Sequence, residues 1–316
     1  MKNQHRRTFL KQASILPLAA SLPSSLLNPN TKERRFKMCL NPGTIGVSVN
    51  QLELLEYADR FGFEAITVNL DEIIKMDKAE RTAFVGQMKD KGISWGSTNL
   101  PVEFRRDEAT FNTDLKELPA KAAALQSVGG TRMNTWIMPT HDTLTYLENF
   151  KSHQNRLQSV ANILGHYGIR LGLEYVGPKT LMARDKFAFI RTMKEGKELI
   201  TAIDESNVGF ILDSFHWFCA GETMADLLTL DKKDIVTVDL NDARKGFAAD
   251  EQIDGKRELP MATGVIDMKN FLQALVEIGY DGPVRAEPFN ARLNEMENEA
   301  AVKMTKEAMS IAFEQV

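Results

Sequence analysis

Cysteine is scarce in this sequence, which has only Cys39 and Cys219 among 316 residues. A chain with so few thiols is not a disulfide-stapled scaffold, and it lacks the cysteine clusters that structural zinc sites use. Both cysteines lie in or beside apolar runs, which favours buried free thiols. A pairing between the two thiols stays open at this stage.

Basic residues are not in surplus either. The formal net charge is −4 and the isoelectric point is near 5.9, whereas nucleic-acid-binding domains usually carry a basic surplus. With 43% hydrophobic and 26% charged residues, the composition is that of a folded soluble protein. A small polar ligand is therefore favoured over a nucleic acid.

No apolar run is long enough to cross a bilayer. The best candidate, residues 13–27, is short and contains Pro17 and Pro23. It follows the segment RRTFLK at residues 6–11, which resembles a twin-arginine export signal, a route that carries folded proteins across the inner membrane. A disordered basic tail is the alternative. We expect residues 1–35 to be signal and linker, residues 36–316 to hold the fold, and the mature protein to be periplasmic.

From residue 36 onward, short β-rich runs alternate with helical patterns such as residues 50–62 and 113–129. The alternation predicts parallel strands joined by helices. Eight units match an α/β fold of the (β/α)8 TIM barrel type, in a single domain. A doubly wound open sheet is the alternative, but NPGTIG at 41–46 is not the glycine pattern it would need. The eight predicted strands are residues 36–41, 64–70, 93–99, 131–137, 169–175, 207–213, 235–241 and 283–289.

The longest stretch without a predicted strand is residues 241–267, directly after the seventh strand. Loops that follow strands carry the function of such barrels, because they are anchored on a rigid scaffold. We therefore expect this loop to act as a lid or to contact the substrate.

Polar residues end every predicted strand. The first four strands end in asparagine, and the last four end in carboxylates; the set is Asn41, Asn69, Asn99, Asn134, Glu174, Asp213, Asp239 and Glu287. One carboxylate at a strand end is often a helix N-cap or a solvated charge. Four around one barrel mouth would repel one another unless a cation lies between them.

A divalent cation is the simplest source of that positive charge. Oxygen ligands alone favour a hard ion, Mg²⁺ or Mn²⁺, over zinc. Glu174 and Glu287 lie three strands apart and could face a substrate from opposite sides. This arrangement suits removal of a proton next to a polarised carbonyl and its return elsewhere.

Five segments of the sequence carry a resemblance to a known family. They are LGLEYVGP, ILDSFHWFCAGE, VDLNDA, ELPMATGVIDMKNFLQAL and GYDGPVRAEPF, in this order. They resemble the sugar phosphate isomerase/epimerase family of xylose isomerase-like TIM barrels, whose best-known branch is D-tagatose 3-epimerase. The likeness covers nearly the whole chain after the export signal and is strongest in the C-terminal half.

The resemblance implies four metal ligands, Glu, Asp, His and Glu, which fall on Glu174, Asp213, Asp239 and Glu287. It also implies that both glutamates form the catalytic acid/base pair. The third ligand is a departure, because Asp239 stands where the family commonly has histidine. A carboxylate can replace an imidazole, but it adds negative charge. We expect Mn²⁺ or Mg²⁺, with Co²⁺ or Zn²⁺ as alternatives.

The same resemblance suggests substrate-binding residues. His216, three residues after Asp213, matches a family histidine that hydrogen-bonds substrate hydroxyls; packing in the core is the alternative. Arg244 and Lys245 follow the seventh strand where the family often has a substrate-binding cation, although either is equally well a solvated loop charge. Trp136 could stack on a sugar ring, and core packing explains it nearly as well.

The expected activity is that of a divalent-metal-dependent sugar isomerase or epimerase. If the proton is not returned and a neighbouring group is expelled, the same residues make a lyase or hydratase of 3-oxo-glycosides. Periplasmic proteins meet glycosides and oxidised sugars more often than cytoplasmic ones do, which keeps this alternative open.

Two other classes of protein fit the sequence less well. A non-catalytic sugar-binding barrel would share the fold and the ligand. An apurinic endonuclease would need more strand-end histidines and a basic groove. No glycine cluster for phosphate follows strands seven or eight, so the expected partner is an unphosphorylated carbohydrate. We expect neither a nucleic-acid partner nor a membrane span, and a homo-oligomer stays open.

Overall fold

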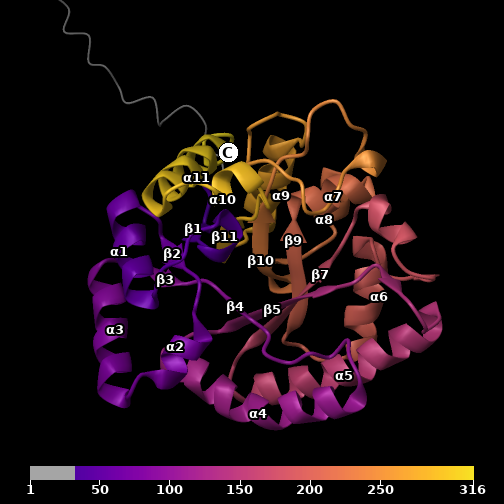
Figure 1. Cartoon of the computed structure of the whole chain (residues 1–316), viewed down its shortest axis with the longest axis horizontal. Helices are drawn as coiled ribbons and strands as arrows, with labels where there is room; N and C mark the ends of the chain where they lie inside the picture. The colour runs from indigo at the N-terminus through magenta and orange to yellow at the C-terminus, as the bar shows by residue number, and fades with distance from the viewer. Residues whose placement is uncertain (1–32) are drawn as a thin grey trace, which may run out of the picture. The chain divides into compact units, whose positions relative to one another are not determined.

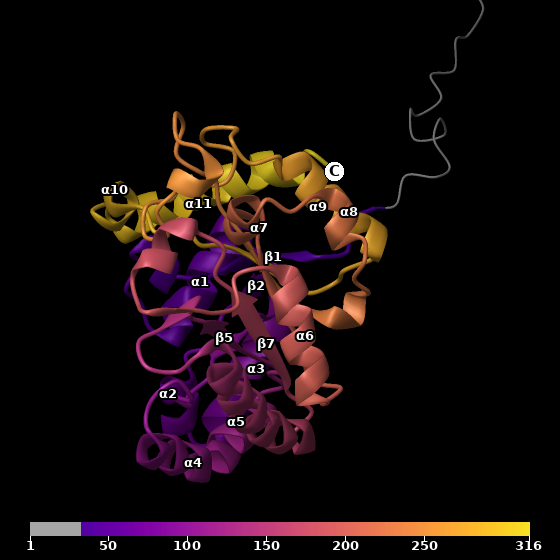
Figure 2. The ribbon, with the colours of Figure 1, turned by 90° about the vertical axis from the view of Figure 1, so that its right-hand side faces the viewer.

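The computed structural model describes residues 33–316, and contacts within Glu33–Val316 join these residues into one unit. Strands lie at the centre of this unit and helices surround them (Figures 1 and 2). The predicted export signal falls almost entirely on residues outside the described part. No helix within residues 33–316 is long and apolar enough to cross a membrane.

The central strands are parallel and form one sheet. Their order is β3-β2-β1-β11-β10-β9-β7-β5-β4. Each begins within one residue of a predicted strand, apart from β4, which continues the third predicted one. The bounds are β1 Lys37–Leu40, β2 Ala65–Ile66, β3 Ser94–Trp95, β4 Thr98–Asn99, β5 Arg132–Ile137, β7 Arg170–Tyr175, β9 Val208–Asp213, β10 Ile235–Leu240 and β11 Pro283–Ala286.

The two ends of this order, β3 and β4, are one stretch of chain with a two-residue break. β3 pairs with β2 and β4 pairs with β5, so the stretch closes the sheet into a ring of eight positions. The break falls at Gly96-Ser97. A Cβ at Gly96 would lie 2.6 Å from the Cys39 sulfur, so only glycine lets the third position pass this close to β1. The predicted TIM barrel is thereby confirmed, with a bent third strand in place of a continuous one.

Helices connect the strands and cover the outside of the ring. Several begin with an Asn, Asp or Thr cap, including Asn50 before α1 and Asp107 before α4. The helices are α1 Gln51–Phe61, α2 Leu70–Lys75, α3 Lys78–Asp90, α4 Glu108–Ser127, α5 Tyr146–His166, α6 Met193–Ile203, α7 Ser214–Ala220, α8 Met224–Leu227, α9 Met268–Ile278, α10 Ala291–Asn294 and α11 Asn298–Phe313.

The loops contain short strands and 3-10 turns. The strands β6 Thr140–His141 and β8 Phe187–Ala188 form a separate antiparallel pair, which the sequence analysis did not predict. Four 3-10 turns are η2 Gly43–Ile45, η3 Lys179–Ala183, η4 Lys232–Asp234 and η5 Ala249–Glu251. An antiparallel bridge between Asp242 and Glu258 ties together the two ends of the loop after β10.

The apolar core fills the space between the strands and the surrounding helices. Cys39 and Cys219 are both buried and free, as predicted. His153 and His166 lie on the outer helix α5.

Candidate metal centre and substrate pocket

A cavity of about 420 Å³ opens at the carboxyl ends of the strands. Its volume is within the range of small-molecule sites, roughly 300–1,000 Å³. Among the residues that line it are Trp136, Glu174, His216, Arg257, Arg285 and Glu287. The site is therefore at the end of the barrel where such folds place their chemistry.

The structure brings the four strand-end carboxylates together. One oxygen each of Glu174, Asp213, Asp239 and Glu287 lies within 4.8 Å of the others. The strand register explains the convergence, because Asp213 of β9 is the direct neighbour of Asp239 of β10. Neighbouring residues on parallel strands point to the same face, here the inside of the barrel.

Asp213 is fixed by its place at the junction of β9 and α7. Its Oδ1 accepts hydrogen bonds from the backbone N–H groups of Phe215 (2.6 Å) and His216 (3.3 Å), as a helix cap does. Its Oδ2 accepts from Asn241 Nδ2 and Arg257 Nη1, each at 2.9 Å. The sequence LDSFH thus sets a rigid carboxylate beside a buried histidine.

Asp239 has a partner that the sequence analysis missed. Arg285 is its direct neighbour in the register of β10 and β11. Arg285 Nε donates to Asp239 Oδ1 at 2.7 Å, and Nη2 donates to Oδ2. Asp239 is 0% and Arg285 6% exposed, so this two-point ion pair is buried. Arg285 stands two residues before Glu287, and period-two alternation was the signal that could have placed it inside the barrel.

A second arginine comes from the long loop after β10. Arg257 Nη1 donates to Asp213 Oδ2 (2.9 Å) and to Glu287 Oε2 (3.2 Å). Arg257 Nη2 donates to Asp254 Oδ1 (2.7 Å) and to His216 Nε2 (3.3 Å). The loop was expected to reach the site, but through Arg244 and Lys245 rather than Arg257.

Arg244 and Lys245 do not line the cavity. The Arg244 guanidinium lies over the Phe247 ring at 4.0 Å, and its backbone N–H donates to Gln252. Lys245 is exposed. Among the described residues, Arg257 is the basic residue of this loop that lines the cavity.

Burial and crowding shift the pKa of both glutamates upward. Burial raises the pKa of Glu287 to about 8, the Asp239 carboxylate adds to the rise, and Arg257 opposes it. Burial, then the charges of Glu287 and Asp213, hold the pKa of Glu174 well above its ordinary value. Oε1 of Glu174 is buried with no hydrogen-bond partner among the described residues. The site thus has more negative charge than its two arginines balance.

These groups fit a divalent cation. Glu174, Asp213 and Glu287 supply closely spaced oxygens, and the unpartnered Oε1 of Glu174 is the kind of atom that a cation would satisfy. His216 lies near the same group, with Nε2 3.9 Å from Glu174 Oε1. Burial lowers the pKa of His216 to about 4, so its ring is neutral near pH 7.

Trp136 lies at the rim of the cavity. It is 45% exposed, and the Arg105 guanidinium covers its ring at 4.1 Å. Core packing does not explain so exposed a ring; an aromatic side chain at a cavity rim suits contact with a sugar.

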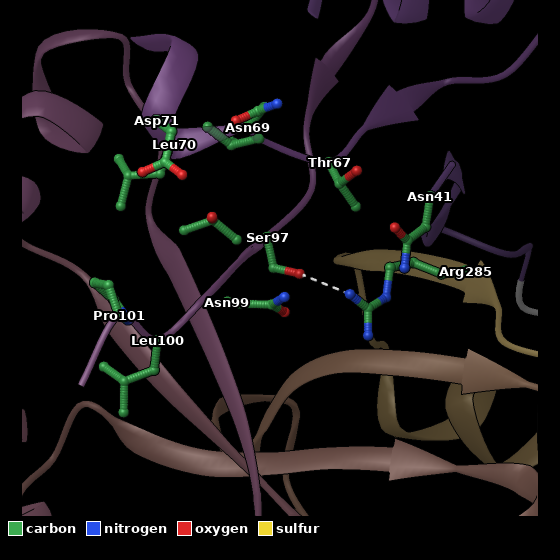
Figure 3. Close-up of a pocket in the computed structure, with 12 residues that line it drawn as sticks. Asn41, Thr67, Asn69, Leu70, Asp71, Ser97, Asn99, Leu100, Pro101 and Arg285 are labelled. Carbon is green, nitrogen blue, oxygen red and sulfur yellow. Dashed lines mark hydrogen bonds between the residues drawn. The ribbon is translucent and has the colours of Figure 1, made fainter. Parts of the chain in front are cut away.

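A second cavity of about 330 Å³ adjoins the first. The two share Asn41, Asn99 and Arg285. Figure 3 shows Arg285 pointing toward Ser97, to whose Oγ its Nη1 donates at 3.3 Å. Three of the four strand-end asparagines, Asn41, Asn69 and Asn99, thus line a polar compartment beside the carboxylates.

The fold and the site define a class: a (β/α)8 barrel with an acidic centre at the carboxyl ends of its last four strands. The sequence pattern of the xylose isomerase-like TIM barrel family matches residues 55–310. The chain belongs to that family.

The chain is also similar in sequence to relatives that are named inosose isomerases. An inosose isomerase of Halalkalibacterium halodurans is 25% identical over 283 residues, which are 86% of this chain and 94% of the relative. An inosose isomerase of Bacillus subtilis is 26% identical over 287 residues, 86% of this chain and 95% of the relative. The expected family is confirmed, but these relatives do not carry the name of its D-tagatose 3-epimerase branch.

Solved structures agree on the fold. A xylose isomerase domain protein from Alicyclobacillus acidocaldarius superposes with a TM-score of 0.78 at 28% identity, covering 89% of this chain and 99% of that one. The IOLI protein with a zinc atom has a TM-score of 0.74 at 24% identity, with the same coverage. D-psicose 3-epimerase from Clostridium cellulolyticum H10 has a TM-score of 0.65 at 15% identity, over 84% of this chain and 93% of that one.

Proposed function

We propose that the protein is a divalent-metal-dependent isomerase of polyhydroxylated ketones. One observation carries the proposal: four strand-end carboxylates converge within 4.8 Å, and Glu174 Oε1 among them has no partner in the described chain. The relatives named inosose isomerase suggest the substrate class. An inosose is a six-membered ring ketone whose other ring carbons carry hydroxyls.

Glu174, Asp213 and Glu287 would hold the cation. Mn²⁺ or Mg²⁺ suits the oxygen ligands, and the zinc of the structural relative keeps Zn²⁺ as an alternative. When bound, the ion would polarise the substrate carbonyl and make the neighbouring C–H more acidic.

The chain's own residues then move the proton. Glu174 takes it from the carbon next to the carbonyl, and the protonated carboxyl group of Glu287 gives a proton back from another direction. The raised pKa of each glutamate suits this work, because it makes the carboxylate a stronger base and, in Glu287, whose pKa is about 8, it keeps a proton available for donation. The neutral ring of His216 is available for a substrate hydroxyl, and Arg257 holds the Glu287 carboxylate in place.

A lyase acting on 3-oxo-glycosides is the second candidate, and the adjoining cavity favours it. A 3-oxo-glycoside is also a ring ketone flanked by hydroxylated carbon. After one glutamate removes the proton α to the carbonyl, the C–O bond at the β carbon breaks. The departing oxygen takes a proton from the other glutamate, and a C=C bond conjugated with the carbonyl remains. The second cavity, about 330 Å³, offers room for the departing group.

A deuterium experiment tests both candidates. The protein with Mn²⁺ or Mg²⁺ is incubated in D₂O with an inosose, with free ketoses and with 3-oxo-glucosides, and products are followed by NMR. Deuterium at a carbon-bound position without bond loss supports the isomerase; release of an alcohol supports the lyase.

Glu174→Gln should lower the rate by a factor of about 10² or more, since a positioned acid or base typically contributes about 10²–10⁴. Glu307→Gln, on the exposed side of α11, is the matched control and should keep the wild-type rate. If Mn²⁺ binds but none of these substrates takes up deuterium or breaks down, both proposed activities are wrong for these substrate classes.

A further inference from the structure

The four converging carboxylates are not equivalent. Asp213 and Glu287 share one cation, Arg257, which gives each of them a single N–H contact, and Glu174 Oε1 has no partner among the described residues. Asp239 differs, because Arg285 occupies both of its oxygens in a two-point contact. Such a fork is a strong, charge-assisted pairing, and it orients the guanidinium as well as binding it.

Arg285 keeps bonding capacity for a ligand. A guanidinium has five N–H groups. Three of them are used, two on Asp239 and one on Ser97 Oγ at 3.3 Å. The remaining two N–H groups have no partner among residues 33–316. Arg285 also lines both cavities, where Asn41 and Asn99 flank the same boundary (Figure 3).

The charge of the pair limits which ligand group it suits. Asp239 cancels the charge of Arg285, and Asp71 lines the adjoining cavity as well. A phosphate or carboxylate would find no unbalanced positive charge at this boundary. A neutral oxygen, either hydroxyl or carbonyl, accepts the two N–H groups without adding charge.

We propose that Arg285 binds a neutral oxygen of the substrate at the junction of the two cavities, and that Asp239 is its positioning residue rather than a metal ligand. This inference deepens the proposed function and rests on it for the substrate class. The metal would then be held by Glu174, Asp213 and Glu287 alone.

A charge-balanced double variant tests the role of Asp239. Asp239→Asn combined with Arg285→Gln removes both charges of the pair, so the net charge of the site is unchanged. Proteins often tolerate the replacement of a buried ion pair when both charged residues are replaced together. Titration calorimetry with Mn²⁺ should give a dissociation constant within about threefold of wild type. Asp213→Asn, the reference for a lost ligand, should weaken Mn²⁺ binding by about tenfold or more, the loss seen even for groups that only support ligands. A double variant that loses Mn²⁺ as Asp213→Asn does would show that Asp239 is a ligand and would overturn the inference.

The conservative variant Arg285→Lys tests substrate binding. It keeps the charge beside Asp239 but loses the two-pronged donor. With an inosose as the probe, KM should rise by about tenfold, equal to about 1.4 kcal/mol, while kcat and Mn²⁺ affinity change little. If KM is unchanged, Arg285 does not contact the substrate.

The two proposals fail in different ways. If no probe is turned over, saturation-transfer NMR with the inosose compares binding by the wild-type protein and by Arg285→Lys, and weaker binding by the variant still supports the inference. If wild type turns the probe over and Arg285→Lys has the same KM, the proposed function survives and the inference falls. Thermal melting of each variant checks that the fold is retained.

Discussion

Gly177 shows how a single residue without a side chain sets the position of a site residue. It follows β7 closely, and a Cβ placed there would lie 2.3 Å from the backbone oxygen of His216. Its own carbonyl accepts two hydrogen bonds from Arg191, at 3.1 and 2.8 Å. The clash would be between two backbone segments, neither of which can rotate away. The loop after β7 and the helix that carries His216 therefore pack as closely as they do because residue 177 is glycine.

Gly177→Ala should lower both stability and turnover. Overpacking of this kind costs about 1–3 kcal/mol of unfolding free energy, and the displaced α7 would move His216 away from the cavity. Urea denaturation and the deuterium assay measure the two effects. Gly86→Ala is the matched control: Gly86 is exposed inside α3, with nothing near its missing Cβ. That change should raise stability by about 0.5–1 kcal/mol. A Gly177→Ala protein as stable and active as wild type would contradict this packing argument.

Only those site residues that are carboxylates at the end of a predicted strand could be predicted from the sequence. Glu174, Asp213, Asp239 and Glu287 each end an apolar run, and the structure brings all four together. Arg285 was not predicted because it lies inside a run, where an arginine is expected to face solvent; its alternation with Glu287 points it into the barrel, and its register with Asp239 supplies the partner that makes its burial possible. Arg257 was not predicted because its position depends on how the loop after β10 folds back through the bridge between Asp242 and Glu258.

Helices and strands were predicted better than their interruptions. The periodic pattern located α1 and α4, and the apolar runs located every strand position of the barrel. The bend at Gly96-Ser97 and the short β6–β8 pair were missed. Both depend on tertiary contacts, such as that between Gly96 and Cys39, and a local sequence pattern contains no record of such contacts.

Helix α5 gives the barrel a built-in acid sensitivity. His153 is 5% exposed and packs between the Phe104 and Phe189 rings, with centroids 5.3 and 4.8 Å away. Its Nδ1 lies 3.0 Å from the Asn149 carbonyl oxygen, and its Nε2 has no partner among the described residues. Burial lowers the pKa of His153 to about 4, from an ordinary value of 6.5. The unfolded chain therefore binds this proton more readily than the folded one.

Acidification should therefore destabilise the fold through this residue. The stability that neutral His153 contributes is fully present above pH 6.5 and is lost as pH falls from 6.5 toward 4. The loss amounts to roughly 3 kcal/mol, since each pKa unit is worth about 1.4 kcal/mol. His153→Phe should make the fall of the unfolding free energy over this pH range less steep, as followed by urea denaturation; His216, whose pKa is also lowered to about 4, accounts for a further part of that fall.

His166 provides the control on the same helix. Its Nδ1 also lies near the carbonyl oxygen four residues earlier, 2.8 Å from that of Asn162, but the side chain is exposed. His166→Phe should leave the fall of the unfolding free energy between pH 6.5 and pH 4 as steep as in the wild-type protein. If His153→Phe also leaves it unchanged, the acid sensitivity arises elsewhere.

At the scale of the whole molecule, the count of strand-and-helix units was enough to predict the architecture, because few arrangements bury eight parallel strands on both sides. The same arrangement gathers residues from distant parts of the chain at one end of the barrel. Asn41 and Glu287 line one cavity although 246 residues separate them in sequence. Local sequence therefore predicts which residues end strands, and the closed ring makes neighbours of them.

The sequence also predicts the cellular location of the protein. The segment RRTFLK at residues 6–11 precedes the described barrel, and we propose that it directs export of the folded protein. Arg6→Lys with Arg7→Lys keeps the charge but removes both arginines of the signal. In a bacterium with the twin-arginine route, this variant should stay in the cytoplasm, as measured by fractionation and immunoblotting. Arg34→Lys with Arg35→Lys changes another adjacent arginine pair, at the start of the barrel, and should leave export unchanged. Equal periplasmic amounts of the Arg6/Arg7 variant and the wild-type protein would show that the segment is only a basic tail, and would remove the reason to favour substrates found outside the cytoplasm.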